Sequence, residues 1–164
     1  MFYLGSIGSN LQPAHHVPWV VRELVELAGV LRLSPVIVTE PAAMQSCHRF
    51  ANALFIFESP LLPTELKAHF NALEAEHGRD RSDPARSVKD RTLDLDLLAY
   101  GEARSGLRGD DLPGYLQPLW PTLNGQPLTE GEWLPFSLGE LQLGDRAATI
   151  YRDAGTGEIA VIDD

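Results

Sequence analysis

Residues 92–100 read Thr-Leu-Asp-Leu-Asp-Leu-Leu-Ala-Tyr and begin with a strict alternation of apolar and charged side chains. Successive side chains of a β-strand point to opposite faces of a sheet, so this period of two predicts a strand whose leucines face a core. Asp94 and Asp96 would then stand side by side on the other face. Paired carboxylates suit Mg²⁺, which takes few protein oxygens, and a solvated sheet face is the alternative interpretation.

The N-terminal segment is expected to form a strand and then a helix. Residues 2–6 are a short apolar stretch that gives way to glycine, serine and asparagine at 5–10, which predicts a strand ending in a turn. The helix that follows would have Pro18 in its first turn and Gly29 at its end, with an apolar stripe at helical spacing between them.

Two further strands and a second helix are expected before the alternating segment. Residues 31–38 should form a strand that Pro35 places at a sheet edge or on a bulge, because proline cannot donate to a sheet ladder. Residues 52–58 are rich in β-forming side chains and short enough for a strand buried on both faces. A helix is predicted over residues 63–78, and its Glu74 would reach water beside the apolar stripe.

The resulting order, β-α-β-β-α-β, predicts a ferredoxin-like α+β fold, an antiparallel sheet with both helices on one face. A chain of 164 residues is long enough for one such domain and too short for two, so we interpret residues 1–164 as a single domain. Residues 1–101 would form its core. Residues 102–164 are a proline-punctuated extension that should end in a β-hairpin between 149–151 and 159–162.

Charge is distributed unevenly along the chain. The formal net charge of −10 argues against a nucleic-acid binder, because such proteins neutralise phosphates with a basic surface. A basic cluster nevertheless precedes the alternating segment, and its members are Arg79, Arg81, Arg86, Lys89 and Arg91. Such a cluster suits a small polyanion such as a nucleotide triphosphate, and a solvated loop is the alternative.

Several other classes of protein are disfavoured. The first basic residue is Arg22 and the apolar runs are too short to cross a membrane, so we expect a cytoplasmic protein without a membrane partner. We also expect a monomer. The single cysteine, Cys47, can form no internal disulfide. The glycines near the N-terminus have neither P-loop nor dinucleotide-binding spacing. Arginines and aspartates would therefore have to position a nucleotide triphosphate and its metal.

Three segments together resemble the 6-hydroxymethyl-7,8-dihydropterin pyrophosphokinase family of folate biosynthesis. These segments are Gly8-Ser9-Asn10-Leu11, Phe50-Ala51-Asn52-Ala53 and Arg91-Thr92-Leu93-Asp94-Leu95-Asp96. The resemblance covers about residues 1–101 in order and spacing. It implies a Mg²⁺-dependent transferase of EC class 2.7.6 that moves pyrophosphate from ATP to the hydroxymethyl group of a reduced pterin.

The resemblance implies a role for each matching charged residue. Asp94 and Asp96 would hold two Mg²⁺ ions that bridge the ATP phosphates. Arg79 and Arg91 would clamp those phosphates during transfer and are the implied catalytic residues. The residues implied for the nucleotide site are Glu74, Arg81 and Leu97.

The same resemblance implies a pterin site. Asn52 would read the edge of the pterin, since an amide both donates and accepts hydrogen bonds, and Phe50 would stack on one face of the ring. Thr39 would meet the ring through its backbone. Without the resemblance, Asn52 would be read as a strand-end turn residue and Phe50 as a core aromatic.

The chain departs from the family pattern after its last predicted strand of the core. Where the family has a histidine and then an arginine, residues 112–119 read Leu-Pro-Gly-Tyr-Leu-Gln-Pro-Leu and contain neither. Arg104 or Arg108 is a candidate to replace the arginine, and Tyr115 or Trp120 to supply a second aromatic against the pterin. A catalytically weak or inactive homologue that binds pterin or nucleotide is the alternative to an active enzyme.

Overall fold

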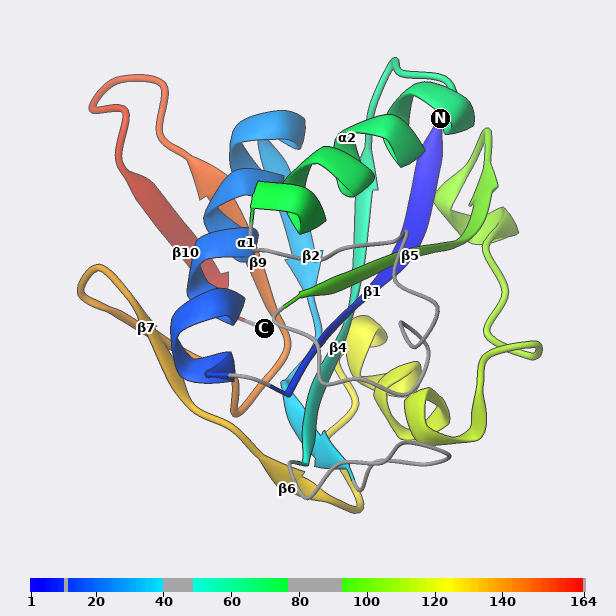
Figure 1. Cartoon of the computed structure of the whole chain (residues 1–164), viewed down its shortest axis with the longest axis vertical. Coiled ribbons are helices and arrows are strands. Elements are labelled where there is room, and N and C mark those ends of the chain that lie inside the picture. The colour runs from blue at the N-terminus through cyan, green and yellow to red at the C-terminus, as the bar shows by residue number, and fades with distance from the viewer. Residues whose placement is uncertain (11, 40–48, 77–92, 164) are drawn as a thin grey trace.

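The computed structural model describes residues 1–10, 12–39, 49–76 and 93–163 and shows a large, mainly antiparallel sheet with two helices packed on it (Figure 1). The elements of its first part are β1 (Phe2–Ser9), α1 (Pro13–Ala28), β2 (Val30–Leu33), β3 (Ile37–Thr39), β4 (Phe50–Glu58), α2 (Pro63–Glu76) and β5 (Asp94–Gly101). Three 3₁₀ helices follow, namely η1 (Arg104–Gly106), η2 (Gly114–Leu119) and η3 (Pro121–Asn124). The remaining strands are β6 (Glu132–Trp133), β7 (Phe136–Leu138), β8 (Leu141–Leu143), β9 (Ala148–Arg152) and β10 (Ile159–Asp163).

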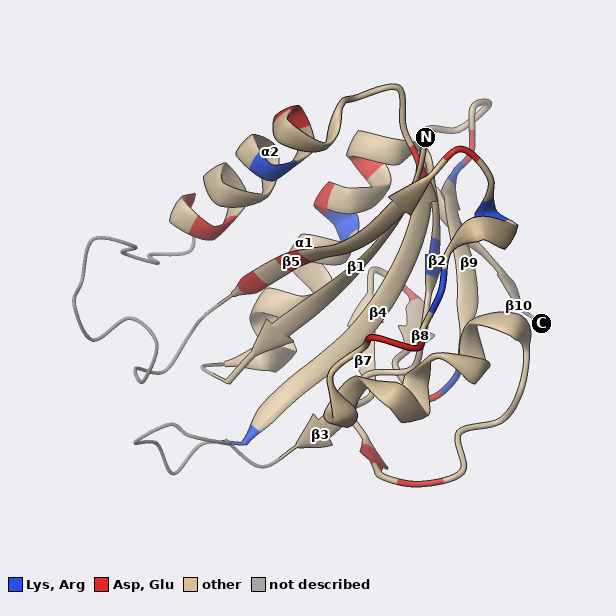
Figure 2. Ribbon diagram, turned by 90° about the vertical axis from the view of Figure 1, so that its right-hand side faces the viewer, with Lys and Arg blue, Asp and Glu red and all other residues tan. Residues whose placement is uncertain are grey.

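The order of the central strands confirms the predicted fold. Hydrogen-bonded neighbours run β10-β9-β2-β4-β1-β5, and every pairing in this sheet is antiparallel. The four strands β2, β4, β1 and β5 are those of a ferredoxin-like unit, with α1 and α2 as its helices. Figure 2 shows both helices on one side of the sheet and the 3₁₀ helices on the other.

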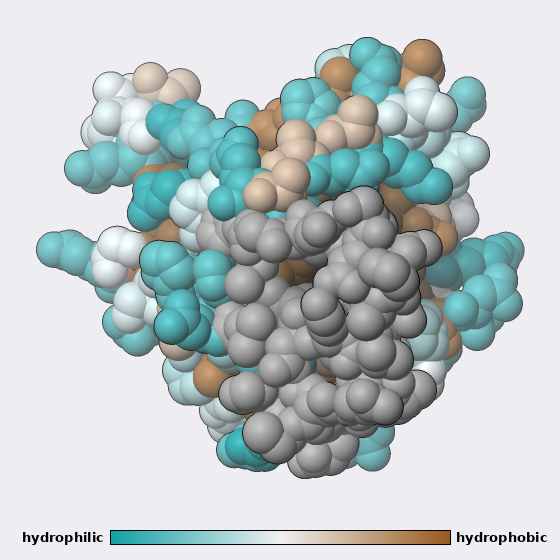
Figure 3. Space-filling model, viewed as in Figure 1, coloured by the Kyte–Doolittle hydropathy of each residue, from teal (hydrophilic) through white to brown (hydrophobic). Residues whose placement is uncertain are grey.

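Each face of the sheet has its own apolar core. On the helical side, residues such as Tyr3 and Phe55 pack with the buried stripe of α1. On the opposite side, Leu54 and Ile56 pack with the leucines of η2 and η3. Strand β4 is therefore buried on both faces, as its composition predicted. The outward side of α2 remains largely hydrophilic, and Figure 3 shows teal and pale residues there.

Strand β1 is longer than predicted, because it continues through the expected turn to Ser9. Glycine within a strand often marks a close approach of neighbouring groups. A side chain at Gly5 would collide with the Phe55 ring and would place its Cβ 2.8 Å from the Asp96 carbonyl oxygen. The glycines of β1 thus allow close packing in the middle of the sheet and do not end the strand.

Two prolines have different places from those predicted. Helix α1 begins at Pro13, so Pro18 lies inside the helix and not in its first turn, while Gly29 ends the helix with φ 82° as expected. The expected strand over residues 31–38 is two strands, β2 and β3, separated at Pro35. The chain stays beside β4 there, because the Ser34 amide donates to the Leu54 carbonyl oxygen at 2.9 Å.

The C-terminal part completes the sheet and covers it. The predicted terminal hairpin is confirmed as β9 and β10, and β9 extends the main sheet by pairing with β2. A second hairpin, β7 with β8, packs near α1 in the helical-side core. None of the helices in the described ranges is long and apolar enough to cross a membrane.

Candidate functional site

The two aspartates of β5 lie on the same face of the edge strand, as predicted. Leu93 and Leu95 are buried, whereas Asp94 is half-buried and Asp96 is exposed. A shift of register farther along the strand, opposite the Leu4–Gly5 step of β1, leaves this pair undisturbed. The regular alternation therefore presents both carboxylates together at the N-terminal end of β5.

The antiparallel register places the predicted pterin residue and the predicted metal ligand in one row across the sheet, with β1 between them. Asn52 of β4 lies opposite Gly8 of β1, and Gly8 lies opposite Asp94 of β5. On the other side Asn52 faces Ile37 of β3, which in turn faces Trp133 of β6. Residues directly opposite one another share a sheet face, so these five residues form a row across five strands. We call this the Asn52–Asp94 row.

Gly8 carries no side chain, and three side chains of the predicted site lie close around it. A Cβ built on Gly8 would lie 3.3 Å from Asn52 Oδ1, 3.6 Å from Asp94 Cβ and 3.8 Å from Phe50 Cδ1. Three residues that the sequence assigned to substrate and metal thus surround a position of β1 that carries no side chain. An amide oxygen, the Cβ of Asp94 and the edge of an aromatic ring therefore lie around Gly8.

Asn52 and Thr39 are brought together by the pairing of β3 with β4. Asn52 is only 6% exposed, and its Nδ2 donates a hydrogen bond of 2.6 Å to Thr39 Oγ1. The bond holds the amide plane and directs Oδ1 toward Gly8. Thr39 was predicted to act through its backbone, but the structure adds a role for its hydroxyl. A buried amide fixed in this way can present one acceptor and one remaining donor to a ligand.

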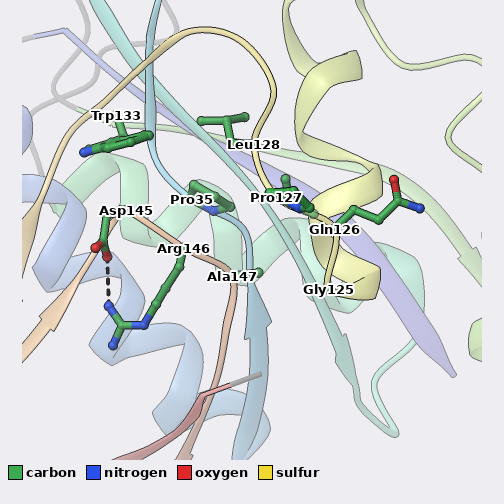
Figure 4. Close-up of a pocket in the computed structure, with 10 residues that line it drawn as sticks. Pro35, Gly125, Gln126, Pro127, Leu128, Trp133, Asp145, Arg146 and Ala147 are labelled. Atoms are coloured by element: carbon green, nitrogen blue, oxygen red, sulfur yellow. Dashed lines mark hydrogen bonds and ion pairs between the residues drawn. The ribbon is translucent and has the colours of Figure 1, made fainter.

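One cavity, with a volume of about 420 Å³, is lined by none of the residues predicted to bind substrate or metal (Figure 4). Ligand sites usually lie in cavities of this size, but this one lies apart from the predicted site. Trp133, Leu128 and Pro35 lie near one another in its wall, and Arg146 pairs with Asp145 at 2.8 Å. Trp133 is the far end of the Asn52–Asp94 row. The buried Ile37 separates this depression from Asn52.

Asp96 lines a different depression, between α2 and β5. This cavity of about 320 Å³ is formed with Leu97, Phe70, Lys67 and Asn71. Leu97 was implied for the nucleotide site, and the structure places it next to Asp96 in the cavity wall. Lys67 and Asn71 were not predicted. Their spacing of four residues on the exposed side of α2 was the available signal, but solvent-facing helices commonly carry such pairs.

Glu74 does not reach water, contrary to the reading from burial statistics. It is 1% exposed, and its Oε2 accepts a hydrogen bond of 2.9 Å from the backbone N–H of Leu95. Leu95 lies between the two aspartates, so this carboxylate ties α2 to the segment that carries them. Glu74 is absent from the residues lining the cavity next to Asp96, so within the described chain it contacts the strand and not that cavity.

The two aspartates fit a magnesium site that the substrate completes. No cluster of three or more histidine, cysteine, aspartate or glutamate side chains occurs within residues 1–10, 12–39, 49–76 and 93–163. Mg²⁺ commonly takes one or two carboxylates and completes its octahedron with water and phosphate oxygens. The half-buried Asp94 and the exposed Asp96 provide such a partial set of oxygen ligands.

Other predicted residues fall elsewhere. Arg79, Arg81 and Arg91 lie outside the described residues. Arg104 donates from Nη2 to the Leu123 carbonyl oxygen at 3.1 Å and lines a cavity with Ile56 and Trp120. Ile56 is four residues along β4 from Asn52, about 13 Å at the rise of a strand. This position leaves Arg104 and Trp120 away from the Asn52–Asp94 row, so neither takes the role considered for it.

Tyr115 is the remaining candidate for a second aromatic. It lies on η2, which contacts β4 and contributes Leu116 and Leu119 to the core on that face. The Tyr115 side chain is 49% exposed. Arg108 is also exposed, in the segment between η1 and η2.

Comparison with known proteins finds one family that matches most of the chain. The family model described as 7,8-dihydro-6-hydroxymethylpterin-pyrophosphokinase matches residues 4–129. A 2-amino-4-hydroxy-6-hydroxymethyldihydropteridine pyrophosphokinase of Porphyromonas gingivalis is 32% identical over 97 residues, which are 58% of this chain and 66% of the relative, just under two thirds of its length. Proteins of the same name from Pseudomonas aeruginosa and Haemophilus influenzae are 28% identical over 141 residues and 30% identical over 99 residues. These matches cover 79% and 58% of this chain, and 85% and 60% of the relatives.

Proposed function

Because the chain belongs to the 7,8-dihydro-6-hydroxymethylpterin-pyrophosphokinase family, we propose that it transfers the pyrophosphoryl group of ATP to 6-hydroxymethyl-7,8-dihydropterin. The observation that carries this proposal is the Asn52–Asp94 row. An amide suited to a pterin edge and a carboxylate suited to Mg²⁺ lie on either side of Gly8. A pterin and a metal-bound phosphate would therefore meet over one strand.

The pterin is proposed to bind over Gly8, against Asn52 and Phe50. Asn52 Oδ1 would accept from a ring N–H, and the second hydrogen on Nδ2 would donate to a ring acceptor. Phe50 would pack against the ring from the start of β4. Tyr115, on η2, is the proposed second aromatic, and Tyr115→Ala should raise the KM for the pterin without changing the KM for ATP.

The nucleotide is proposed to bind along the edge of the sheet beside β5. Its base would occupy the cavity between Leu97 and Asn71, with the triphosphate running past Asp96 toward Asp94. Asp94 and Asp96 would hold two Mg²⁺ ions, which when bound neutralise charge on the phosphates. Arg79 and Arg91 remain the proposed clamps on the same phosphates.

The chemical step is an in-line displacement. The hydroxymethyl oxygen forms a bond to the β-phosphorus of ATP and releases its proton to water. The bond from that phosphorus to the oxygen that bridges the α- and β-phosphates breaks, and AMP leaves with the electron pair. The chain's own contribution is placement. Asn52 and Phe50, close to Gly8, would align the acceptor, and the carboxylates of β5 would locate the phosphates through the metal. All of these groups come from a single chain, so we propose a monomer as the functional unit.

The test is release of AMP from ATP in the presence of Mg²⁺ and 6-hydroxymethyl-7,8-dihydropterin. Asp96→Asn should lower kcat by at least about 100-fold, because it removes a proposed ligand of the Mg²⁺ that stabilises the charge developing on the phosphates. Asp110→Asn is the matched control, since Asp110 is an exposed aspartate in the segment between η1 and η2. AMP release that is equal in the Asp96→Asn variant and the unaltered protein would refute the proposed metal site.

The second candidate function is a binding protein without turnover. The family histidine and arginine are missing from residues 112–119. This segment instead packs Leu112, Leu116 and Leu119 into the core, which suits a structural role. This reading predicts saturable binding of the pterin or ATP by calorimetry and no AMP above background. Sustained turnover would exclude it.

A further inference from the structure

The cavity at the opposite end of β4 from Asn52 has a composition of its own. It has a volume of about 450 Å³ and lies between β4, the segment after β5, and η3. Ile56, Leu107 and Leu123 are buried and give it an apolar floor. Its polar side chains are those of Arg104, Ser105 and Asn124, and Trp120 completes the wall.

Arg104 is the charged side chain of this cavity and can only donate hydrogen bonds, whereas Ser105 and Asn124 can both donate and accept. Arg104 has one hydrogen-bond partner in the described part of the chain, the Leu123 carbonyl oxygen, which leaves most of its guanidinium N–H groups available. Arg32, which is 6% exposed, donates from Nε to the same carbonyl oxygen at 3.0 Å. Two guanidinium groups therefore converge on one oxygen beside the cavity. Neither aspartate nor glutamate is among the lining residues.

Trp120 is held in a fixed position at the cavity wall. A Cβ on Gly109 would lie 2.7 Å from Trp120 Cδ1, so the glycine backbone packs directly on the indole. Only glycine permits this approach. An indole fixed in this manner presents a rigid aromatic surface at little entropic cost, which favours binding of a flat ring.

From these features we propose that the cavity binds a small aromatic carboxylate. The ring would pack on Trp120 and the apolar floor, and the carboxylate would take hydrogen bonds from Arg104 and from the Ser105 hydroxyl. The single guanidinium group of Arg104 matches a ligand with one negative charge. The positive charge of Arg32 lies nearby and favours an anion at this place, although the net charge of the protein is −10. This site lies about 13 Å along β4 from Asn52 and does not depend on the proposed pyrophosphokinase activity.

The experiment follows the three tryptophan indole N–H signals of ¹⁵N-labelled protein by NMR. Loss of one signal in Trp120→Phe assigns Trp120. Indole-3-carboxylate should shift the Trp120 signal in a saturable way, and neutral indole-3-carboxamide should bind at least about tenfold more weakly. Asp96→Asn protein without ATP or pterin should give the same result, which separates this site from the catalytic one.

Arg104→Gln should weaken the binding of indole-3-carboxylate at least about tenfold, because it removes the charge-assisted hydrogen bond to the carboxylate. Arg108→Gln is the matched control, because Arg108 is an exposed arginine of the same segment that does not line the cavity. The proposal is overturned if the amide binds as well as the acid, if Arg104→Gln retains full affinity, or if the shift appears only at Trp19 or Trp133. Inorganic phosphate binding as tightly as the aromatic acid would also overturn it.

Discussion

The carboxylate of Glu74 accepts a hydrogen bond of 2.9 Å from the backbone N–H of Leu95, between the two aspartates of β5. Both partners are nearly inaccessible to solvent. The edge strand that carries the proposed metal ligands is thus fixed to α2 by a buried acceptor. A metal site made of only two protein carboxylates depends on such support, because small displacements of catalytic groups are costly.

Replacing Glu74 with leucine should therefore destabilise the protein. The Leu95 N–H would lose its acceptor, and a buried unsatisfied donor costs about 1–3 kcal/mol. Glu74→Gln keeps an acceptor oxygen and should lower the free energy of unfolding by less. The measurement is urea denaturation followed by circular dichroism, with the exposed Glu76→Leu as a control that should stay within about 0.5 kcal/mol. Equal stability of Glu74→Leu and the unaltered protein would show that the bond does not support β5.

Asn52→Leu should weaken pterin binding and leave ATP binding intact. The change removes the edge contact proposed for the pterin and also the bond to Thr39 Oγ1, with a similar side-chain volume. We expect the KM for the pterin to rise roughly 10- to 100-fold, since a polar ligand edge would be left unpaired. Thr39→Val removes only the orienting bond and should have a smaller effect. A rise in the KM for ATP of the same size would contradict the assignment of Asn52 to the pterin.

Two glycines of β1 should respond differently to alanine. At Gly5 the new Cβ would meet the Phe55 ring and the Asp96 carbonyl oxygen, so Gly5→Ala should destabilise folding by about 1–3 kcal/mol. At Gly8 the nearest atom would be Asn52 Oδ1 at 3.3 Å, and the methyl group would mainly fill the proposed pterin space. Gly8→Ala should accordingly keep most of the stability and lose pterin affinity. Calorimetric titration and thermal melting of both variants distinguish these outcomes.

Tyr3 should make stability depend on pH in the alkaline range. Burial chiefly raises the pKa of its phenol above the usual value of about 10, and the charges of Glu65 and Tyr100 add to this. Its hydroxyl also donates to the Leu61 carbonyl oxygen. The unfolded chain would release this proton at a lower pH than the folded protein. The neutral Tyr3 phenol therefore contributes to the free energy of unfolding below a pH of about 10, and this contribution is lost as the pH rises through the folded-state pKa.

The alkaline dependence can be measured by denaturation at several pH values, with phenolate formation followed by absorbance at about 295 nm. Tyr3→Phe should reduce the fall in stability above pH of about 10. An unchanged slope in this variant would mean that another group causes the fall.

The local pattern of the sequence was sufficient for some features of the site. The alternation through Leu93, Asp94 and Leu95 determined which side chains share a face, because the period of a strand is a property of its backbone. The composition of β4 likewise indicated burial on both faces. Such features depend on neighbouring residues alone, which is why they could be predicted.

Other features depended on pairing between distant segments. Glycines that looked like a turn lie inside β1, since the close approach of Phe55 to Gly5 exists only in the assembled sheet. Glu74 looked solvent-exposed until the fold placed a backbone donor of β5 against it. On either side of Pro35, β2 and β3 pair with the same strand, β4, and β9 pairs with β2. These pairings join distant segments and do not appear in the local sequence.

The sequence by itself determined the two acidic side chains on one strand face and the order of helices and strands that forms the sheet. Only the tertiary structure decided that Asn52 and Asp94 would lie on opposite sides of Gly8, and that Arg104 and Trp120 would lie at the other end of β4. The reason is that side-chain alternation is local, whereas strand register is set by the packing of all the strands together, and a shift of one residue would turn every side chain to the other face.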